Sequence, residues 1–348
     1  MSNNGWQHLG AMSKDELTGS MVGLIPSVIQ KDFYVQTAKQ LVHTMPEWFK
    51  EKKMPMKSIR KGISKRGSMT RAYSAGEKTM SINMYADCYH EGFIEQYDIT
   101  VDDCNKLSHN LIAAINRVCP GPLKTMKFLQ NLAAYEIGTY QYFKDGKIAT
   151  KKYKEFKKQL NELMYKNDKT DEELDILSSL VNQKSEYVYK LVEGNGKTFI
   201  KWVTPSGFLV VYKNFRTRSL QAKGSILGVG RISHIAQEYT NIPNIRGYMS
   251  GISPQFTHSM DGSHMALIIN EWEGDFAAVH DAYATHAPMV EELLNLTKEK
   301  FIHIYDKENF YDYMEEAILS NTEGLTVEQP KLGKLNIEDV RSSDYFFA

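Results

Sequence analysis

The order of helical and strand patterns along the chain is the feature that most constrains its fold. Helical apolar spacing recurs in five stretches, at residues 14–21, 32–43, 98–118, 151–182 and 288–304. We expect Pro-Gly-Pro at 120–122 to end the third of them. β-Branched and aromatic residues gather instead at 197–203 and 208–212, around the turn-forming Thr-Pro-Ser-Gly, which predicts a hairpin. With a short apolar strand at 276–279, the pattern indicates an α+β fold.

Composition narrows the class of protein further. With 348 residues and 42% hydrophobic content, the chain can bury a large core, and its length allows two or three subdomains. It has no run of 18 apolar residues and no signal peptide, so we expect no membrane partner and a cytoplasmic location. Cys88, Cys104 and Cys119 lie far apart without a Cys-x-x-Cys pair, so we expect buried thiols and neither disulfides nor a structural zinc site.

The charges balance over the whole chain but not locally. Lys and Arg number 42, as do Asp and Glu. Residues 47–78, however, hold ten Lys or Arg and three Glu, and residues 194–237 hold seven Lys or Arg and no acid. Local basic surfaces on a neutral protein are typical of phosphate binding, whether to a polymer or to a nucleotide. Solvated lysine-rich faces explain the same composition, and composition alone favours them.

The basic segment at 59–73 has a spacing that suits a nucleotide. In helical form Lys61, Lys65, Met69 and Tyr73 recur every four residues and share one face. Lys65 and Tyr73 are then about 12 Å apart along the axis, comparable to the reach from a triphosphate to its base. Gly62 and Gly67, the glycines of this segment, each cost about 1 kcal/mol in a helix, which suggests close approach to the backbone. An exposed basic helix with one buried tyrosine is the alternative.

A second candidate lies where the strand at 276–279 ends in His280-Asp281. Two-metal enzymes often place a carboxylate at a strand end, where the sheet fixes the oxygen position. Two cations about 4 Å apart need at least two carboxylates, and the sequence offers no second aspartate of this kind. Taken alone, a His-Asp dipeptide is weak evidence for a site.

Six blocks of sequence resemble, in order, those of the single-subunit RNA polymerases of phages and mitochondria. Gly5, Gln7 and His8 are similar to the first palm motif of that family, Asp-Gly-Ser-x-x-Gly-x-Gln-His. The helix at 59–73 resembles the nucleotide-binding fingers helix. The blocks span residues 2–27, 61–73, 202–208, 258–264, 280–281 and 335–348. The resemblance is weak between about 90 and 195.

The resemblance implies a role for each matched residue. Asp281 would hold Mg²⁺, one of two ions, and Lys65 would contact the triphosphate of an incoming NTP. Tyr73 and His258 would position the sugar and select ribonucleotides. The other implied substrate-binding residues are Lys61, Arg66, Met69, His280 and Phe347. The implied partners are a DNA template, the RNA transcript and NTPs.

The resemblance also implies that the first palm motif is incomplete. Matching Gly5, Gln7 and His8 places the first catalytic aspartate of the family one residue before Met1. We therefore expect a second polymerase subunit to supply that aspartate, with the Met1 backbone carbonyl near the metal. Lys61 also departs from the family, because it stands where the family helix opens with arginine, and Arg60 precedes it by one position.

The implied architecture is a right-hand polymerase fold whose palm is completed by another chain. Residues 1–30 would be a palm remnant, 31–257 the fingers, and 258–348 the returning palm with a C-terminal extension. If a phage encodes this chain, we expect the protein to be located in the cytoplasm of the host bacterium. Two alternatives remain, an inert nucleic-acid-binding subunit and a fragment of a related DNA polymerase. In such DNA polymerases glutamate usually follows the aspartate, whereas Ala282 follows it here.

Overall fold

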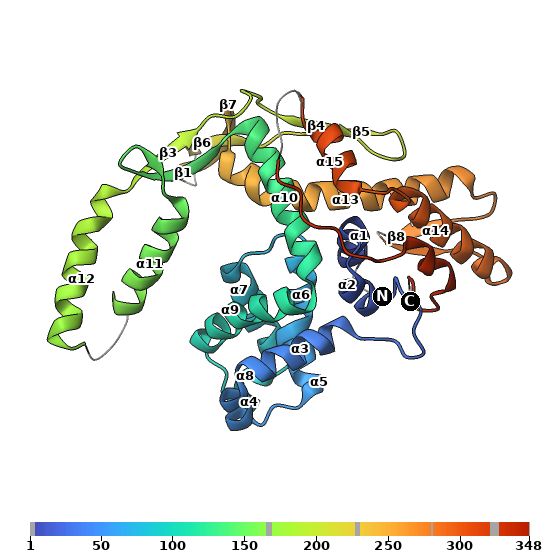
Figure 1. Ribbon diagram of the computed structural model, residues 1–348, viewed down its shortest axis with the longest axis horizontal. Helices are drawn as coiled ribbons and strands as arrows, with labels where there is room; N and C mark the ends of the chain where they lie inside the picture. Colours follow the sequence, from blue (N-terminus) through green and yellow to red (C-terminus); the bar gives the residue numbers. More distant parts are fainter. Residues whose placement is uncertain (1–3, 165–168, 227–229, 280, 321–326, 348) are drawn as a thin grey trace. The chain divides into compact units, whose positions relative to one another are not determined.

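The computed structural model describes residues 4–164, 169–226, 230–279, 281–320 and 327–347 (Figure 1). It divides into two compact units. Unit 1 consists of Met1–Leu132, Ile200–Tyr212 and Met249–Ala348, and unit 2 of Ala133–Phe199 and Lys213–Tyr248. Helices and strands are both present, so the expected α+β class is confirmed. Among the described residues no helix is long and apolar enough to cross a membrane.

The first part of unit 1 is helical. Its elements are α1 (Asn4–Ser13), α2 (Glu16–Met21), α3 (Phe33–Thr44), α4 (Pro46–Lys52), α5 (Met56–Ser58), the π-helix η1 (Ile59–Ser64), α6 (Lys65–Arg71), α7 (Glu77–His90), α8 (Phe93–Tyr97), α9 (Val101–Val118) and α10 (Pro120–Ile137), which continues into unit 2. Helices α3, α6 and α7 pack against α9. All three cysteines are buried free thiols, as expected.

Helix α9 illustrates why this region folds as it does. A capping box starts it, because the Thr100 side chain accepts from the Asp103 backbone N–H while Asp103 accepts from the Thr100 N–H. Its buried residues recur at a spacing of three and four and form one apolar face, namely Cys104, Leu107, Ser108, Leu111, Ala114, Ile115 and Val118. This face is the centre against which the neighbouring helices pack.

The remainder of unit 1 returns late in the chain. It contains β4 (Ile200–Val203), β5 (Leu209–Tyr212), α13 (Ile245–Glu271, from residue 249 onward), β8 (Ala277–Val279), β9 (Ala282–Ala284), the short η3 (Ala287–Met289), α14 (Val290–Tyr305), α15 (Phe310–Ile318) and η4 (Ile337–Ser342). Strands β4 and β5 pair antiparallel, with Ile200 opposite Tyr212, which confirms the predicted hairpin. Trp202 of β4 is buried and donates to the Ser259 hydroxyl of α13 at 2.8 Å.

The C-terminal segment runs along the first two helices. The Gly333 and Leu335 N–H groups donate to the carbonyls of Ser13 and Lys14, both at 2.9 Å. Further on, the Ser343 hydroxyl donates to the Gly23 carbonyl at 2.7 Å. Residues more than 300 positions apart in sequence therefore share one part of the core (Figure 1).

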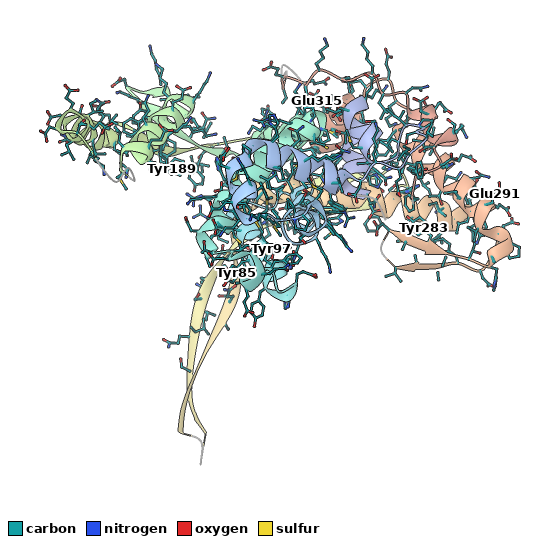
Figure 2. All side chains as sticks on the ribbon, turned by 90° about the horizontal axis from the view of Figure 1, so that it is seen from below. Tyr85, Tyr97, Tyr189, Tyr283, Glu291 and Glu315 are labelled. Carbon is teal, nitrogen blue, oxygen red and sulfur yellow. The ribbon has the colours of Figure 1, made fainter. Side chains whose placement is uncertain are left out.

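The described residues of unit 2 include two antiparallel sheets and the helices α11 (Thr150–Met164) and α12 (Asp171–Gln183). Unit 2 also contains β1 (Thr139–Lys144), β2 (Lys147–Ile148), η2 (Lys184–Glu186), β3 (Val188–Val192), β6 (Phe215–Ile226) and β7 (Gly230–Pro243). The first sheet has the order β2-β1-β3. Strands β6 and β7 form a long twisted antiparallel ribbon, seen edge-on in Figure 2. A small hydrophobic core of Tyr153, Phe156 and Leu160 joins α11 to the sheet and to α12.

One sequence prediction was wrong in detail, and another was right but incomplete. The helical pattern at 151–182 is two helices, α11 and α12, because a second capping box at Thr170 starts a new helix. Pro-Gly-Pro at 120–122 ends α9 but also begins α10. Proline has no N–H to donate, and the first turn of a helix leaves its N–H groups without intrahelical partners, so proline is well tolerated there. The assignment of palm and fingers stays a prediction, and its boundary at 257/258 falls inside α13.

Candidate active site

Helix α1 is buried along its whole length within unit 1. Trp6, 1% exposed, packs on Phe33 and donates through Nε1 to the Ser68 carbonyl of α6 at 3.0 Å. Gly5, one residue earlier, faces the end of the α6 region, where a side chain at position 5 would place its Cβ 2.9 Å from the Tyr73 hydroxyl. The first matched block and the basic helix are therefore in direct contact.

Tyr73 and His258 are stacked, although 185 positions separate them in sequence. Their ring centroids lie 4.4 Å apart and their planes differ by 7°. Tyr73 follows α6 and is half-buried, while His258 lies on the exposed side of α13. Burial raises the pKa of Tyr73 to about 12, with Asp261 and Asp281 adding to the effect and a backbone hydrogen bond from Gly5 opposing it. The Tyr73 hydroxyl is therefore neutral at pH 7.

The basic face of the same segment is exposed, and it differs from residue to residue. Lys61 Nζ lies 2.5 Å from a Glu91 carboxylate oxygen, and Arg66 lies 2.9 Å from Asp87. Lys65 is exposed and forms no ion pair within the described part of the chain. Lys65 can therefore bind a phosphate directly, whereas Lys61 and Arg66 would first have to break their ion pairs with Glu91 and Asp87.

Met69 belongs to this face, whereas Arg60 is turned toward α3. Met69 lies between Lys65 and Tyr73 and is 43% exposed. Arg60 donates to Asp32 at 2.6 Å, and its guanidinium carbon lies 5.5 Å from the Tyr34 ring centre. Arg60 is therefore engaged with α3, so it does not take the place of the arginine that the resemblance led us to expect near Lys61.

The two glycines of the segment have a packing role. A Cβ at Gly62 would lie 2.7 Å from the Phe93 ring, and a Cβ at Gly67 would lie 2.7 Å from Leu111. What approaches this backbone closely is therefore the side chains of α8 and α9. Packing against these side chains explains both glycines, so they give no evidence that a ligand approaches the backbone here.

Asp281 directly precedes β9 and is half-buried. Burial raises the pKa of Tyr34, Tyr73 and Tyr283, and the negative charge of Asp281 adds to the rise in each case. Asp281 therefore lies close enough to all three tyrosines to act on them electrostatically. Tyr283, labelled in Figure 2, is two residues further along the chain. The predicted carboxylate and the predicted sugar-binding pair thus share one region of unit 1.

A second carboxylate, Asp261, lies beside them but is already engaged. Asn4 Nδ2 donates to its Oδ1 at 2.6 Å, and His8 Nε2 lies 3.7 Å from the same oxygen. Burial raises the pKa of Asp261, but the interactions with His8 and Asn4 outweigh burial and lower it overall. On the other side of the His8 ring, Nδ1 lies 2.6 Å from the Tyr305 hydroxyl. This network fixes α1 against α13 and α14.

The C-terminal Phe347 packs near the same region. Its ring stacks on Tyr283, with centroids 5.2 Å apart, and meets the edge of His264 at 5.6 Å. His264 is fully buried and donates through Nε2 to the Thr297 carbonyl at 2.8 Å. Burial lowers the pKa of His264 to about 4, so its ring is neutral at pH 7.

The described residues contain no group of three or more His, Cys, Asp or Glu side chains arranged to hold a metal ion. Asp281 is thus a single candidate ligand, which suits a Mg²⁺ that takes one or two carboxylates together with substrate phosphates and water. The predicted contributions of Met1 and His280 lie outside the described residues. The structure stacks Tyr73 on His258, places Asp281 near Tyr73 and packs Phe347 on Tyr283, and the catalytic and binding roles of these residues stay predictions.

Sequence reasoning assigned no contact at the site to Asn4, His8 or Asp261, although His8 was matched to the first motif. Asp261 lies within the block 258–264, which the resemblance had already marked as relevant to the site. Nothing in that block, however, shows that the Asp261 carboxylate faces α1. Gly5 was recognised as part of the first motif, but its contact with Tyr73 was not foreseen.

Comparisons with known proteins agree with the sequence blocks. Residues 1–329 match the family model described as DNA-dependent RNA polymerase. DNA-directed RNA polymerase 1A of Nicotiana tabacum is 30% identical over 153 residues, which cover 42% of this chain and 94% of that protein. DNA-directed RNA polymerase 3B, chloroplastic, of the same plant is 31% identical over 151 residues, 42% of this chain and 15% of its own length.

A mitochondrial relative gives the same picture. DNA-directed RNA polymerase 1, mitochondrial, of Nicotiana sylvestris is 30% identical over 153 residues, again 42% of this chain and 15% of that protein. The match therefore spans only a small part of the organellar enzymes, although it spans nearly all of the shorter relative. The family model nevertheless covers most of the chain. The resemblance inferred from the six sequence blocks is confirmed, and the chain belongs to the DNA-dependent RNA polymerase family.

Proposed function

We propose that this chain carries the nucleotide-addition site of a DNA-directed RNA polymerase. The observation that carries the proposal is the parallel stack of Tyr73 on His258 beside Asp281, with Lys65 exposed on the same helical segment. A base and sugar fit against the stacked rings, the triphosphate against Lys65, and the reacting phosphate near Asp281. The substrates are then NTPs, an RNA 3′ end and a DNA template.

The residues divide the work by chemistry. Lys65 neutralises charge on the triphosphate, and this kind of electrostatic stabilisation is the main catalytic contribution in phosphoryl transfer. Lys61 and Arg66 reach phosphate only by exchanging their carboxylate partners Glu91 and Asp87. The neutral Tyr73 hydroxyl and the His258 ring offer a polar edge to the sugar. In a right-hand polymerase fold, Lys65 and Tyr73 belong to the fingers and Asp281 to the palm.

Asp281 is the residue we assign to Mg²⁺. A bound Mg²⁺ supplies charge stabilisation at the phosphate oxygens. Asp281 by itself suits one ion, and a second ion needs another carboxylate. Asp261 is a poor candidate, because its Oδ1 accepts from Asn4 at 2.6 Å and faces the His8 ring at 3.7 Å. We therefore propose that the further carboxylate comes from outside the described residues, on a second polymerase subunit that completes the palm.

The test is RNA extension by the complex that copurifies with the tagged chain, on a primed DNA template with Mg²⁺ and NTPs. Asp281→Asn removes the charge at nearly constant shape, and we expect extension to fall by about a hundredfold or more. Asp275→Asn is the matched control, because Asp275 is an exposed carboxylate six residues earlier, paired with His286. Activity of the control should stay near that of the unmodified complex.

Two outcomes contradict the proposal. Undiminished extension by Asp281→Asn would mean that the chain is an inert subunit of the complex. Preferential use of deoxynucleotides would mean that it belongs to a DNA polymerase. The second-subunit proposal has its own test, because extension by the isolated chain at the rate of the complex would contradict it.

A further inference from the structure

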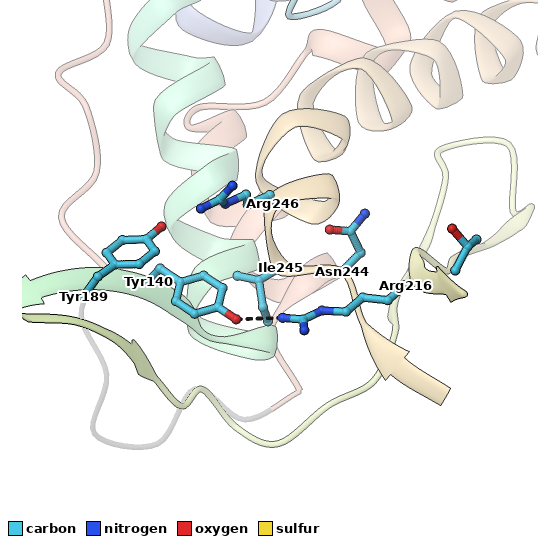
Figure 3. Close-up of a pocket in the computed structure, with 7 residues that line it drawn as sticks. Tyr140, Tyr189, Arg216, Asn244, Ile245 and Arg246 are labelled. Atoms are coloured by element: carbon cyan, nitrogen blue, oxygen red, sulfur yellow. Dashed lines mark hydrogen bonds between the residues drawn. The ribbon is translucent and has the colours of Figure 1, made fainter. Parts of the chain in front are cut away.

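Unit 2 contains a pocket of about 490 Å³ that the proposed nucleotide-addition site does not use. It lies where β1 and β3 meet the foot of the β6–β7 ribbon and the first residues of α13 (Figure 3). Its volume falls in the range of small-molecule pockets and is large enough for a nucleotide. The residues that matter for its chemistry are Tyr140, Tyr189, Arg216, Asn244, Ile245 and Arg246.

One wall of the pocket is built from stacked tyrosine rings. Tyr140 and Tyr189 stack with centroids 5.1 Å apart and planes 19° apart. Tyr142, directly opposite Tyr189 in the sheet, supports it at 4.6 Å, and Tyr142 in turn stacks on Tyr153 of α11 at 3.5 Å. This ladder of rings leads from the pocket into the core of unit 2. Tyr189 remains 41% exposed, so a ring is available to a ligand on a fixed support.

Two guanidinium groups flank this wall. Arg216 donates to the Tyr140 hydroxyl at 2.7 Å, and the guanidinium carbon of Arg246 lies 5.9 Å from the Tyr189 ring centre. Both arginines are exposed. None of the residues assigned to the pocket is acidic. Arginine binds phosphate in a bidentate manner, so the positive charge and the flat rings together suit a phosphate attached to an aromatic base.

We propose that this pocket binds one nucleotide of a single-stranded nucleic acid. The base lies on the exposed Tyr189 ring, the flanking phosphates contact Arg216 and Arg246, and the Asn244 amide faces the base edge. Stacking on an aromatic ring accepts any base, and two separate arginines suit the successive phosphates of a strand. The proposal is independent of nucleotide addition, because every residue involved belongs to unit 2.

The first experiment measures binding of a fluorescein-labelled 12-nucleotide oligo-dT to the full chain by fluorescence anisotropy. The buffer contains EDTA and no NTP, so the proposed metal site does not contribute. From the usual contribution of base stacking, Tyr189→Ala should weaken binding about five- to a hundredfold. Arg216→Gln should weaken it and lower the dependence of log Kd on log salt by about 0.7, the value for one phosphate of a single strand.

Matched variants separate stacking from charge. Tyr189→Phe keeps the ring and should bind like the unmodified chain. Lys152→Gln removes an exposed charge from α11 of the same unit and should also leave binding unchanged. Because Arg216 is exposed, its variant should fold even if Tyr189→Ala does not, and a thermal melt of each variant checks this.

A photo-crosslinking experiment locates the strand directly. An oligonucleotide carrying 5-iodouracil should crosslink to the peptides that contain Tyr140 or Tyr189, equally well in Asp281→Asn. Crosslinks confined to unit 1, or unchanged affinity in both Tyr189→Ala and Arg216→Gln, would overturn the proposal. Competition by free AMP as effective as competition by an unlabelled strand would show that the pocket takes a mononucleotide, and would also overturn it.

Discussion

Position 5 is the clearest case in which a single residue controls the candidate site. A Cβ there would lie 2.9 Å from both Cζ and Oη of Tyr73 and 3.2 Å from the Ala72 Cβ. Gly5→Ala should therefore push the Tyr73 ring away from its stack on His258. We expect KM for NTPs to rise and the free energy of unfolding to fall by about 1–3 kcal/mol, the usual cost of overpacking.

Gly262→Ala is the control for that substitution. Gly262 lies inside α13, where an added Cβ would have no atom within 4 Å, and alanine favours a helix over glycine by about 0.5–1 kcal/mol. Steady-state kinetics and urea unfolding of both variants make the comparison. Equal KM values for Gly5→Ala and the unmodified complex would show that the Tyr73 ring does not need this contact.

His264 gives a prediction about pH. Burial holds its pKa at about 4 in the folded chain, below its ordinary value of 6.5, although Asp261 and the Thr297 carbonyl act in the opposite direction. The folded state therefore favours the neutral ring. The free energy of unfolding that this preference contributes is fully present above pH 6.5, the ordinary pKa of histidine. It is lost as the pH falls toward 4, by roughly 3 kcal/mol in all.

Urea unfolding between pH 7.5 and 4.5 measures this contribution. The lowered pKa of Asp261 acts below its ordinary value of 3.8, outside this window. His264→Gln keeps an N–H donor for Thr297 but cannot titrate, so its free energy of unfolding should fall less steeply with decreasing pH. Parallel curves for the two proteins would assign the acid sensitivity to other groups.

For single residues, the spacing in the sequence was enough to predict exposure but not contacts between distant parts of the chain. The four-residue spacing from Lys61 to Tyr73 predicted that Lys61 and Lys65 would be exposed, and both are, although residues 59–64 form a π-helix and not an α-helix. The Asn4–Asp261–His8 network could not be predicted, because 257 positions separate Asn4 from Asp261 and only the fold brings them together. The resemblance implied that Tyr73 and His258 both act on the sugar, but neither the resemblance nor the spacing predicted that their rings stack.

Among the elements, α3 and η1 are joined in part by the carboxylate of Asp32, alongside hydrogen bonds from Ser64 of η1 to α3. Asp32 caps α3 by accepting from the Val35 N–H at 3.0 Å, and it also accepts from Arg60 Nε at 2.6 Å. Asp32→Ala removes both interactions and should lower the free energy of unfolding by about 1–2 kcal/mol. Asp32→Asn keeps the cap and loses only a half-exposed ion pair, so it should cost less than about 1 kcal/mol.

Urea unfolding of the two Asp32 variants distinguishes the cap from the ion pair. An equal decrease in the free energy of unfolding for Asp32→Ala and Asp32→Asn would mean that the stabilising effect of Asp32 comes from its charge and not from its helix cap. This outcome would also make the contact between α3 and η1 sensitive to salt, because an exposed ion pair is screened whereas a cap is not.

Prediction of elements failed for reasons that the structure makes clear. The amphipathic α9 and the β4–β5 hairpin carry strong periodic signals and were found. The β6–β7 ribbon was missed because the side chains described for it form no buried face to impose alternation. Leu220, Ile235 and Tyr239, for example, are all substantially exposed. Helix α10 was missed because proline was interpreted as a terminator when it stands in the first turn.

At the scale of the whole molecule, zero net charge coexists with local positive charge. The 42 acidic side chains match the 42 basic ones in number, but segments 47–78 and 194–237 are strongly basic. Several carboxylates that balance them are held in ion pairs on packed helices, such as Glu91 with Lys61 and Asp87 with Arg66. Net charge is therefore a poor guide to whether this chain binds phosphates.

We accordingly expect the chain to bind nucleic acid with a strong dependence on salt. Log Kd for an oligo-dT strand should rise linearly with log salt between about 50 and 200 mM, with a slope of about 0.7 for each phosphate contacted, because binding releases counterions. A methylphosphonate strand of the same sequence is the control, since it keeps the bases and lacks the charges. Its binding should be weaker and nearly independent of salt. If both strands gave the same slope, the basic segments would be solvated faces without a role in binding, the interpretation that composition alone favours.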